Sequence, residues 1–281
     1  MISSLYSPAK INWFLKILGK RADGYHNIYS VMQRIALSDT LSFEETAGEI
    51  VIESDLEIAM EENLVYKAAV LFKKHTSCSS GARIKLVKKI PLQAGLGGGS
   101  SNAATTLFGL NNLWKTGLNL RTLTELGATL GSDVPFFLNG PIAVVEGRGE
   151  VITPLETSTK EITLLIVKPE HGISTALAYK EVAAYSEMEK SRLALLIEIL
   201  RNCRIDRLPE VLGNDFEEPV YRLYPELKDI RDRLLNQGAV AALLCGSGSS
   251  ILGVFTNRAD AEEASRSFGD LWHVVTETVS Q

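Results

Sequence analysis

Cysteine is scarce in this sequence, with only Cys78, Cys203 and Cys245 among 281 residues. An odd number of widely separated cysteines fits neither a disulfide framework nor the ligand spacing of a zinc site. The first residues, MISSLYSPAK, also lack the basic region and the apolar stretch of a secretory signal. We therefore expect a protein of a reducing compartment, with a cytoplasmic location.

Long apolar runs and an excess of one charge are absent too. No stretch reaches the roughly 18 apolar residues that a membrane-spanning helix needs, so we expect no membrane partner. Lys and Arg number 29 against 34 Asp and Glu, which gives a formal net charge of −5. A nucleic-acid-binding protein would show a basic field, so we expect no nucleic-acid partner either. The rest of the composition, 45% hydrophobic and 22% charged residues, is that of an ordinary folded protein.

The length allows one large domain or two ordinary ones, at roughly 100–200 residues per domain. Between residues 150 and 163 the sequence becomes polar, contains a proline and loses its periodicity, which is typical of a domain boundary. We therefore predict an N-terminal domain at residues 1–155 and a C-terminal domain at residues 156–281.

The periodicity of the apolar residues predicts a mixture of strands and helices. Strands are expected at residues 9–17, 28–37, 41–44, 49–54, 82–89, 141–145, 162–167, 239–244, 251–255 and 271–276. Helices are expected at residues 62–75, 101–113, 121–130, 174–184, 189–201, 226–236 and 259–268. Because strands and helices alternate irregularly and the first strands follow one another directly, an α+β fold is favoured over a doubly wound sheet.

A glycine-rich segment, PLQAGLGGGSSNAAT at residues 91–105, is the strongest local signal. Four of the five residues from 95 to 99 are glycine, and a helix is predicted to open at the two serines that follow. Glycine lets the backbone come close to a ligand, and the free N–H groups at a helix N-terminus bind anions. A flexible linker or a simple helix cap is the alternative, but a strand and an Ala-rich helix flank the segment tightly. The spacing excludes a P-loop and a dinucleotide-binding fingerprint.

Three further segments carry candidate residues. SPAKINWFLKILGKRADGYH at residues 7–26 places Lys10 and Asn12 on the polar face of an otherwise apolar strand, where a lysine is usually just solvated. Asp133 lies in LGSDVPFF, where it could simply cap a helix. LLCGSGSSILGVF at residues 243–255 forms a glycine-containing turn between two strands and could be no more than a tight hairpin.

Taken in this order, these segments resemble the three motifs of the GHMP kinase superfamily, which includes galactose, homoserine, mevalonate and phosphomevalonate kinases. ADGYH, just after the first motif, resembles the branch whose substrate is 4-diphosphocytidyl-2-C-methyl-D-erythritol. The resemblance is dense from residue 7 to about residue 150 and resumes at NDFE (214–217) and CGSGSS (245–250). It implies the two-domain GHMP architecture, with the active site in the cleft between the domains.

The resemblance also implies an activity, namely ATP-dependent phosphorylation of the 2-hydroxyl of that small-molecule substrate in non-mevalonate isoprenoid biosynthesis. Asp133 would accept the proton of the hydroxyl, and Lys10 would keep that carboxylate ionised and stabilise the developing negative charge. Mg²⁺ would arrive with ATP, since no cluster of His, Cys or carboxylate residues suggests a dedicated metal site. The protein ligand of Mg²⁺ stays open.

Binding roles follow from the same resemblance. The residues that it implies for ATP binding are Asn63, Leu64, Lys88, Pro91, Gly95, Leu96, Gly97, Gly98, Gly99, Ser100 and Ser101. The residues that it implies for binding the cytidine diphosphate substrate are Asn12, Tyr25, His26 and Tyr179. A flat base with donors and acceptors on its edge suits aromatic stacking combined with hydrogen bonds.

Several alternatives stay open at this point. Tyr179 could be a core residue on a helix face, and Lys88 could belong to a solvated strand face. Another GHMP kinase with homoserine or mevalonate as its substrate is a rival, although ADGYH speaks against it. A non-catalytic nucleotide-binding relative is a second rival, although it would be expected to lose Lys10 or Asp133. The protein could be a monomer or a homodimer.

Cys245 departs from the superfamily pattern, which has Ser or Thr at this position of the third motif. The resemblance places it close to the chemistry, where nearby positive charge would favour a reactive thiolate. Alternatively it is an inert buried residue, as most free cysteines are.

Overall fold

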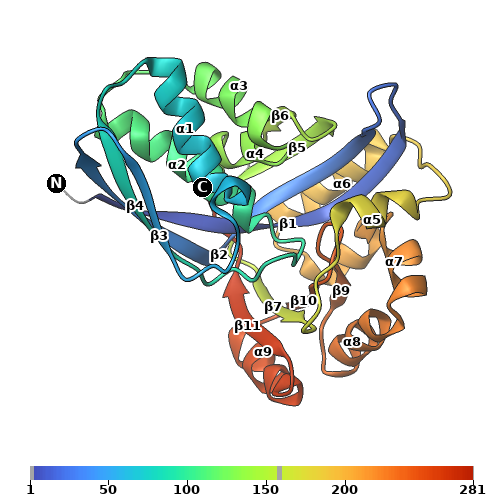
Figure 1. Cartoon of the computed structure of the whole chain (residues 1–281). Helices are drawn as coiled ribbons and strands as arrows, with labels where there is room; N and C mark the ends of the chain where they lie inside the picture. Colours follow the sequence, from blue (N-terminus) through green and yellow to red (C-terminus); the bar gives the residue numbers. More distant parts are fainter. Residues whose placement is uncertain (1–2, 157–159, 281) are drawn as a thin grey trace.

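Two β-sheets and the helices around them make up the molecule, shown in Figure 1 as a computed structural model. The structure describes residues 3–156 and 160–280. The first sheet contains β1 (Ser3–Lys20), β2 (His26–Thr46), β3 (Ile50–Ser54), β4 (Gly81–Val87), β5 (Ile142–Gly147), β6 (Val151–Pro154) and β8 (Gly213–Asn214). The second contains β7 (Thr163–Lys168), β9 (Ala241–Leu244), β10 (Ile251–Phe255) and β11 (Trp272–Glu277).

The helices pack outside these sheets. They are α1 (Leu64–Thr76), α2 (Gly98–Leu113), α3 (Leu120–Leu130), α4 (Val134–Leu138), α5 (Thr175–Lys180), α6 (Lys190–Arg201), α7 (Glu217–Leu223), α8 (Pro225–Asn236) and α9 (Arg258–Ser265), with 3-10 turns at Met60–Glu62, Ile205–Glu210 and Arg266–Phe268. Helices α1 to α4 lie above the first sheet in Figure 1, and the second sheet lies below it with α8 and α9. This arrangement confirms the predicted α+β class.

A long antiparallel hairpin of β1 and β2 runs across the middle of the molecule (Figure 1). We expected β2 as two strands, at residues 28–37 and 41–44, but it is continuous from His26 to Thr46. The register shifts between Pro8 and Ala9, so two extra residues of β2 are accommodated there. A bulge of this kind breaks the alternation of apolar residues without ending the strand, which is why the sequence pattern indicated a gap.

The order of the first sheet is β3-β4-β2-β1-β8, with β5 beside β2 and β6 beside β5. The second sheet has the order β11-β7-β10-β9 and is antiparallel throughout. β8 comes from the second half of the chain yet pairs in parallel with Phe14 and Leu15 of β1. The division at residue 155 therefore stays a prediction, and residues 157–159 of the expected boundary stretch lie outside the described residues.

Both faces of β1 are covered. Ile11 and Trp13 are fully buried in one cluster with Leu164 and Ile166 of β7, so the second sheet packs on this face. Helix α2 packs against β1 and β2 from the other side. For this reason Lys10 is only 3% exposed, and the interpretation of Lys10 as a solvated strand residue is wrong.

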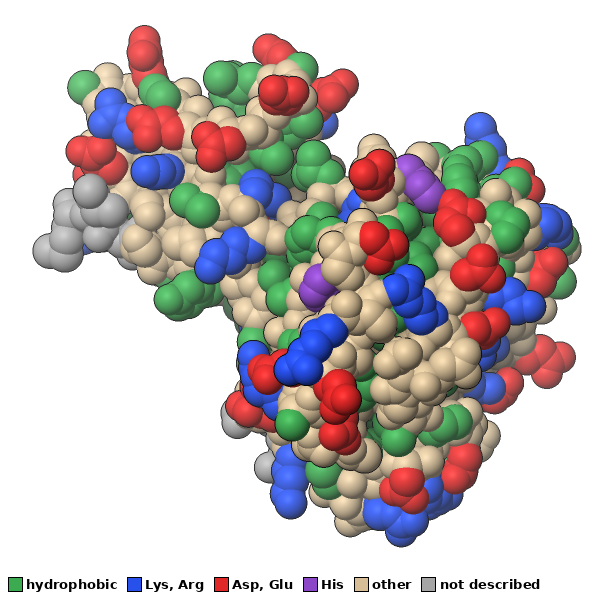
Figure 2. Space-filling model, turned by 90° about the horizontal axis from the view of Figure 1, so that it is seen from below, with side chains coloured by type: hydrophobic (Ala, Val, Ile, Leu, Met, Phe, Trp, Pro, Cys, Tyr) green, Lys and Arg blue, Asp and Glu red, His purple; other side chains and the backbone are tan. Residues whose placement is uncertain are grey.

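The periodicity missed two short strands, β6 and β8, and two short helices. α4 and α7 were not expected, and α2 begins at Gly98 rather than at residue 101. No described helix combines the length and the apolarity needed to cross a bilayer. On the face shown in Figure 2, Lys and Arg side chains are interspersed with Asp and Glu side chains.

Candidate active site

A cavity of about 940 Å³ brings most of the predicted site residues together. The cavity is lined by residues of the β1–β2 hairpin, the glycine-rich segment, α5 and the third glycine-containing segment. The predicted residues that line it are Lys10, Tyr25, His26, Leu64, Lys88, Pro91, Gly95, Leu96, Gly97, Gly98, Gly99, Ser100, Asp133 and Tyr179. These residues come from both halves of the chain.

The glycine-rich segment is a tightly packed turn that leads directly into α2. Gly95 and Gly97 adopt φ angles of +74° and +70°, which residues with a side chain rarely take. A Cβ atom on Gly95 would lie 1.8 Å from the backbone oxygen of Cys245, so the segment packs directly against the third glycine-containing segment. The flexible-linker interpretation is therefore wrong.

The start of α2 points into the cavity. Gly98, Gly99 and Ser100 form its first turn and line the cavity. The first N–H groups of a helix have no acceptor within the helix, and they carry the positive end of its dipole. The geometry of this turn suits an anion, and the anion cradle stays a prediction.

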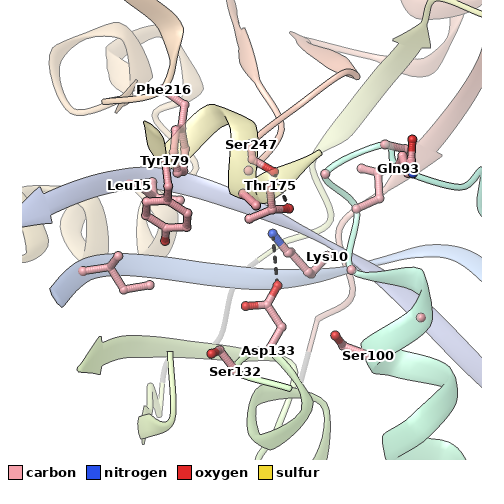
Figure 3. A pocket seen from close by; sticks show the side chains of 18 of the residues that line it. Lys10, Leu15, Gln93, Ser100, Ser132, Asp133, Thr175, Tyr179, Phe216 and Ser247 are labelled. Atoms are coloured by element: carbon pink, nitrogen blue, oxygen red, sulfur yellow. Dashed lines mark hydrogen bonds and ion pairs between the residues drawn. The ribbon is translucent and has the colours of Figure 1, made fainter. Parts of the chain in front are cut away.

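Lys10 and Asp133 face each other in the cavity (Figure 3), with 3.7 Å between Lys10 Nζ and Asp133 Oδ2. Lys10 Nζ also donates a hydrogen bond of 2.9 Å to Asn12 Oδ1. Asp133 precedes α4, but its side chain makes no capping hydrogen bond. The helix-cap interpretation of Asp133 is therefore wrong, and the side chain is free to face the cavity.

Three predicted site residues lie outside the cavity lining. Asn12 is fully buried and donates a hydrogen bond of 2.8 Å from its Nδ2 to Ser30 Oγ, so it links Lys10 to Ser30. Asn63 caps α1, since its Oδ1 accepts the N–H of Val65. Ser101 is fully buried, and the Ser7 hydroxyl donates to its Oγ. In this structure Asn12 supports Lys10, and the other two hold the starts of α1 and α2.

The predicted aromatic residues gather at the hairpin end of the cavity. The rings of His26 and Tyr179 stack with centroids 4.7 Å apart, and Tyr179 also meets Phe216 edge to face. Tyr25 is 50% exposed, and the guanidinium of Arg148 lies 4.9 Å from the centre of its ring. Tyr179 thus packs on a core phenylalanine and lines the cavity as well.

Two of these rings have shifted pKa values. Burial and the positive charge of Lys20 lower the pKa of His26, so its imidazole is neutral at pH 7. Burial and the negative charge of Asp133 raise the pKa of Tyr179, so its hydroxyl stays protonated. This end of the cavity therefore presents neutral rings with hydrogen-bonding groups.

Lys88 is not part of a solvated face. Its ammonium is bonded to the buried carboxylate of Asp39 and donates to Asn102 Oδ1 at 3.1 Å. The next residue, Lys89, is exposed and fits the solvated interpretation.

Several cavity residues were missed by the sequence analysis. The hydroxyl groups of Thr175 and Ser247 share a hydrogen bond of 2.9 Å close to Lys10 (Figure 3). Ser247 lies in the third glycine-containing segment and Thr175 in the expected helix at residues 174–184, so both segments were identified but the contact between them was not. Lys20, Arg148 and Lys180 add positive charge around the cavity. Lys20 lies in the segment at residues 7–26 but was not singled out there, and no local pattern marked Arg148 or Lys180.

The hypothesis of a reactive Cys245 is wrong. Its side chain is completely buried, and burial raises the pKa of its thiol to about 12. A thiol with that pKa carries almost no thiolate at pH 7, so Cys245 is a packing residue.

Comparison with known proteins decides the family. The families described as GHMP kinases N terminal domain and GHMP kinases C terminal match residues 63–141 and 184–274. A protein of Thermodesulfovibrio yellowstonii named 4-diphosphocytidyl-2-C-methyl-D-erythritol kinase is 46% identical over 277 residues, which cover 96% of each chain. The chain belongs to the GHMP kinase family. The predicted resemblance is thus confirmed.

Other GHMP kinases agree with this assignment. A Haemophilus ducreyi protein of the same name is 40% identical over 262 residues, covering 92% of this chain and 88% of its own. The crystal structure of a 4-(cytidine 5'-diphospho)-2C-methyl-D-erythritol kinase matches with a TM-score of 0.87 at 30% identity, over 99% of this chain and 100% of its own. Homoserine kinase of Cytophaga hutchinsonii matches with a TM-score of 0.74 at 16% identity, over 99% and 95%, and shares the fold. The two-domain GHMP architecture is confirmed as well.

Proposed function

We propose that this GHMP kinase transfers the γ-phosphoryl group of ATP to the 2-hydroxyl of 4-diphosphocytidyl-2-C-methyl-D-erythritol, the compound in its relatives' names. The observation that carries the proposal is the pair of Lys10 and Asp133, whose charged groups lie 3.7 Å apart. The same cavity holds an anion cradle on one side and stacked rings on the other. The cavity is therefore assigned as the active site.

The glycine-rich segment supports the assignment of the ATP phosphates to one side of the cavity. The N–H groups of Gly98, Gly99 and Ser100 would donate to phosphate oxygens, aided by the α2 dipole. The ammonium of Lys88 adds a positive charge beside this turn. Apolar lining by Leu64 and Pro91 suits the adenosine part.

The rings support placing cytosine at the other side. Tyr25 has an exposed face on which a base can stack. His26 is neutral and offers one donor and one acceptor nitrogen to the edge of the base. Tyr179 holds the imidazole plane by stacking against it.

Basic residues around the cavity suit the substrate's diphosphate. Lys20, Arg148 and Lys180 line the cavity together with the rings. Their charges would attract the diphosphate and thereby direct the methylerythritol hydroxyl toward Asp133. We assign these three residues to substrate binding.

Phosphoryl transfer then needs a proton acceptor and stabilisation of negative charge. The Asp133 carboxylate accepts the proton of the 2-hydroxyl as that oxygen bonds to the γ-phosphorus, and the bond from this phosphorus to the ADP oxygen breaks. The Lys10 ammonium offsets negative charge on the group in transfer. Asn12 holds Lys10 in place through the hydrogen bond to its Nζ.

Magnesium is assigned to the nucleotide. Among the described residues, no group of three or more His, Cys, Asp or Glu side chains is placed to hold a metal ion. Mg²⁺ bound to ATP would neutralise charge on the β- and γ-phosphates. We place the enzyme in the cytoplasm, as its few unpaired cysteines support, and in isoprenoid precursor biosynthesis.

One assay tests the proposed function. The purified protein is incubated with ATP, MgCl₂ and either the cytidine substrate, homoserine or mevalonate, and ADP release is followed. We expect ADP with the cytidine substrate alone, and none after addition of EDTA. The Asp133→Asn variant, prepared identically, controls for a contaminating kinase. Equal turnover of mevalonate, or no turnover of any alcohol, would refute the assignment.

A further inference from the structure

Asp39, in the second half of β2, is a fully buried carboxylate with four donors. Its Oδ1 accepts the backbone N–H groups of Lys89 and Ile90 at 2.7 and 2.9 Å. Its Oδ2 accepts Lys88 Nζ and, at 2.9 Å, Asn102 Nδ2. A buried carboxylate is unfavourable unless it is paired and hydrogen-bonded, and here both conditions are met.

These donors come from the two ends of the glycine-rich segment. Lys88, Lys89 and Ile90 lie immediately before residue 91, where the segment begins, and Asn102 lies in its last part, within α2. A single side chain of the sheet thus holds the entry and the exit of the turn. We call Asp39, Lys88, Asn102 and the backbone of residues 89–90 the Asp39 cluster.

The cluster extends to β1 and fixes the start of α2. Asn102 Nδ2 also donates to Ser7 Oγ at 2.9 Å, and the Ser7 hydroxyl donates to Ser101 Oγ at 2.8 Å. Ser7, Ser101 and Asn102 are all buried. The first turn of α2 is therefore tied to both long strands of the hairpin.

Asp39 also decides where the Lys88 ammonium lies. The Lys88 side chain is 15% exposed, and it lines the cavity. A Cβ atom on Gly98 would lie 3.3 Å from Lys88 Nζ, so the ammonium sits beside the first turn of α2. Without Asp39, nothing among the described contacts of Lys88 except Asn102 would hold it there.

We propose that Asp39 is a positioning residue for the nucleotide phosphates. It keeps the glycine-rich turn in its anion-binding shape and holds the Lys88 ammonium at the N-terminus of α2. Asp39 itself does not line the cavity, so it acts through these groups. The inference rests on the proposed placement of ATP.

The test is Asp39→Asn, which keeps the shape of the side chain but removes its charge and one acceptor oxygen. We expect the Kd of Mg-ATP, measured by titration calorimetry on the full chain, to rise roughly 10- to 100-fold, the effect of losing one charge-assisted hydrogen bond. The KM of the cytidine substrate and kcat at saturating ATP should change less than about threefold. Asp39→Glu, which restores the charge, should recover part of the affinity.

Asp215 offers a matched control. Its carboxylate also accepts a lysine, Lys16 Nζ at 2.9 Å, and a backbone N–H, that of Ile17 at 2.8 Å. Both donors belong to β1, and neither belongs to α2 or the glycine-rich segment. Asp215→Asn should therefore leave the Kd of Mg-ATP unchanged, which separates a local effect of Asp39 from a general loss of buried charge.

The Lys88→Met variant separates the role of Asp39 from the placement of ATP. If Lys88→Met raises the Kd of Mg-ATP and Asp39→Asn does not, the role of Asp39 is refuted while the ATP site stands. If neither variant changes the Kd, the proposed placement of ATP fails too. Combined, the two substitutions should raise the Kd by less than the product of their single effects, because Asp39 acts in part through Lys88.

Asn102→Ala keeps the proposal testable if Asp39→Asn does not fold. It removes one of the four donors and leaves the Asp39 charge paired with Lys88. We expect a several-fold rise in the Kd of Mg-ATP with an unchanged KM for the cytidine substrate. An unchanged Kd in a folded Asn102→Ala variant would overturn the role of the cluster.

Discussion

Asp133 carries the proton transfer in the proposed reaction, and its environment supports this role because its carboxylate faces Lys10 rather than the helix that follows it. Asp133→Asn preserves shape but cannot accept a proton. We expect kcat to fall roughly 10²- to 10⁴-fold with a nearly unchanged Kd for ATP. Steady-state kinetics and nucleotide titration measure the two quantities.

Lys10→Ala provides the companion measurement. If both residues act on one transition state, the double variant should lose less activity than the product of the single losses. If the Asp133→Asn variant keeps most of the catalytic rate of the unmodified protein, the role of Asp133 is structural.

Tyr25 is expected to bind the cytosine ring. Because its ring is half exposed with Arg148 on one face, Tyr25→Ala should weaken substrate binding by about 1–3 kcal/mol. The KM of the substrate measures this loss, and the Kd of ATP should stay constant. A lower melting temperature with an unchanged substrate KM would show instead that Tyr25 stabilises the hairpin.

His26 makes stability depend on pH. Its pKa in the folded chain is lower than its ordinary value of 6.5, because of burial and Lys20. At a pH between the folded and the unfolded pKa of His26, the unfolded chain binds more protons than the folded chain. The folded state is therefore most stable, as far as His26 is concerned, above pH 6.5, and it loses stability as the pH falls below 6.5. His26→Gln should therefore lose less stability than the unmodified protein between about pH 7.5 and pH 5.5 in urea titrations. The exposed His75 provides the control, and an equal effect of His75→Gln would contradict this account.

At the scale of elements, the long periodic helices were predictable, and the short helices α4 and α7 were not. α1 and α3 were predicted within a few residues, because each buries an apolar face with helical spacing. α4 has five residues and begins with Val134 and Pro135, which is too short for any periodicity to show. Asp133 is the residue immediately before this helix. The sequence therefore predicted Asp133 as a candidate but did not predict the helix that positions its backbone.

The glycine-rich turn allows a prediction with a close control. Gly95→Ala should raise the Kd of ATP and lower the melting temperature, since its Cβ would meet the Cys245 carbonyl. Gly117 has a similar φ of +68° with nothing within 4 Å of an added Cβ. Gly117→Ala should therefore show only the left-handed strain of roughly 1–2 kcal/mol, with an unchanged Kd. Equal effects of the two substitutions on ATP binding would mean that the contact with Cys245 is irrelevant.

At the scale of the whole molecule, the contacts between distant segments escaped prediction. Motif spacing identified Lys10 and Asp133 as candidates, but it did not show that Lys10 is buried. That burial follows from the packing of the second sheet on β1, which depends on residues such as Leu164 and Ile166 far along the chain. The basic residues Arg148 and Lys180 escaped for the same reason, since only the fold brings them to the cavity.

This packing predicts that the protein unfolds as one unit although it contains two GHMP domains. Ile11 and Trp13 share one buried cluster with Leu164 and Ile166, and β8 pairs with β1 in the first sheet. Neither half can unfold without exposing the apolar face of the other, so the two halves should unfold together.

Scanning calorimetry measures this directly. We expect a single transition whose calorimetric and van't Hoff enthalpies agree. Mg-ATP at about 100 times its Kd should add about 2.7 kcal/mol of stability and move the whole transition to higher temperature. Two resolved transitions, of which Mg-ATP moves only one, would show that the halves are independent and that the cluster shared by β1 and β7 contributes little to their coupling.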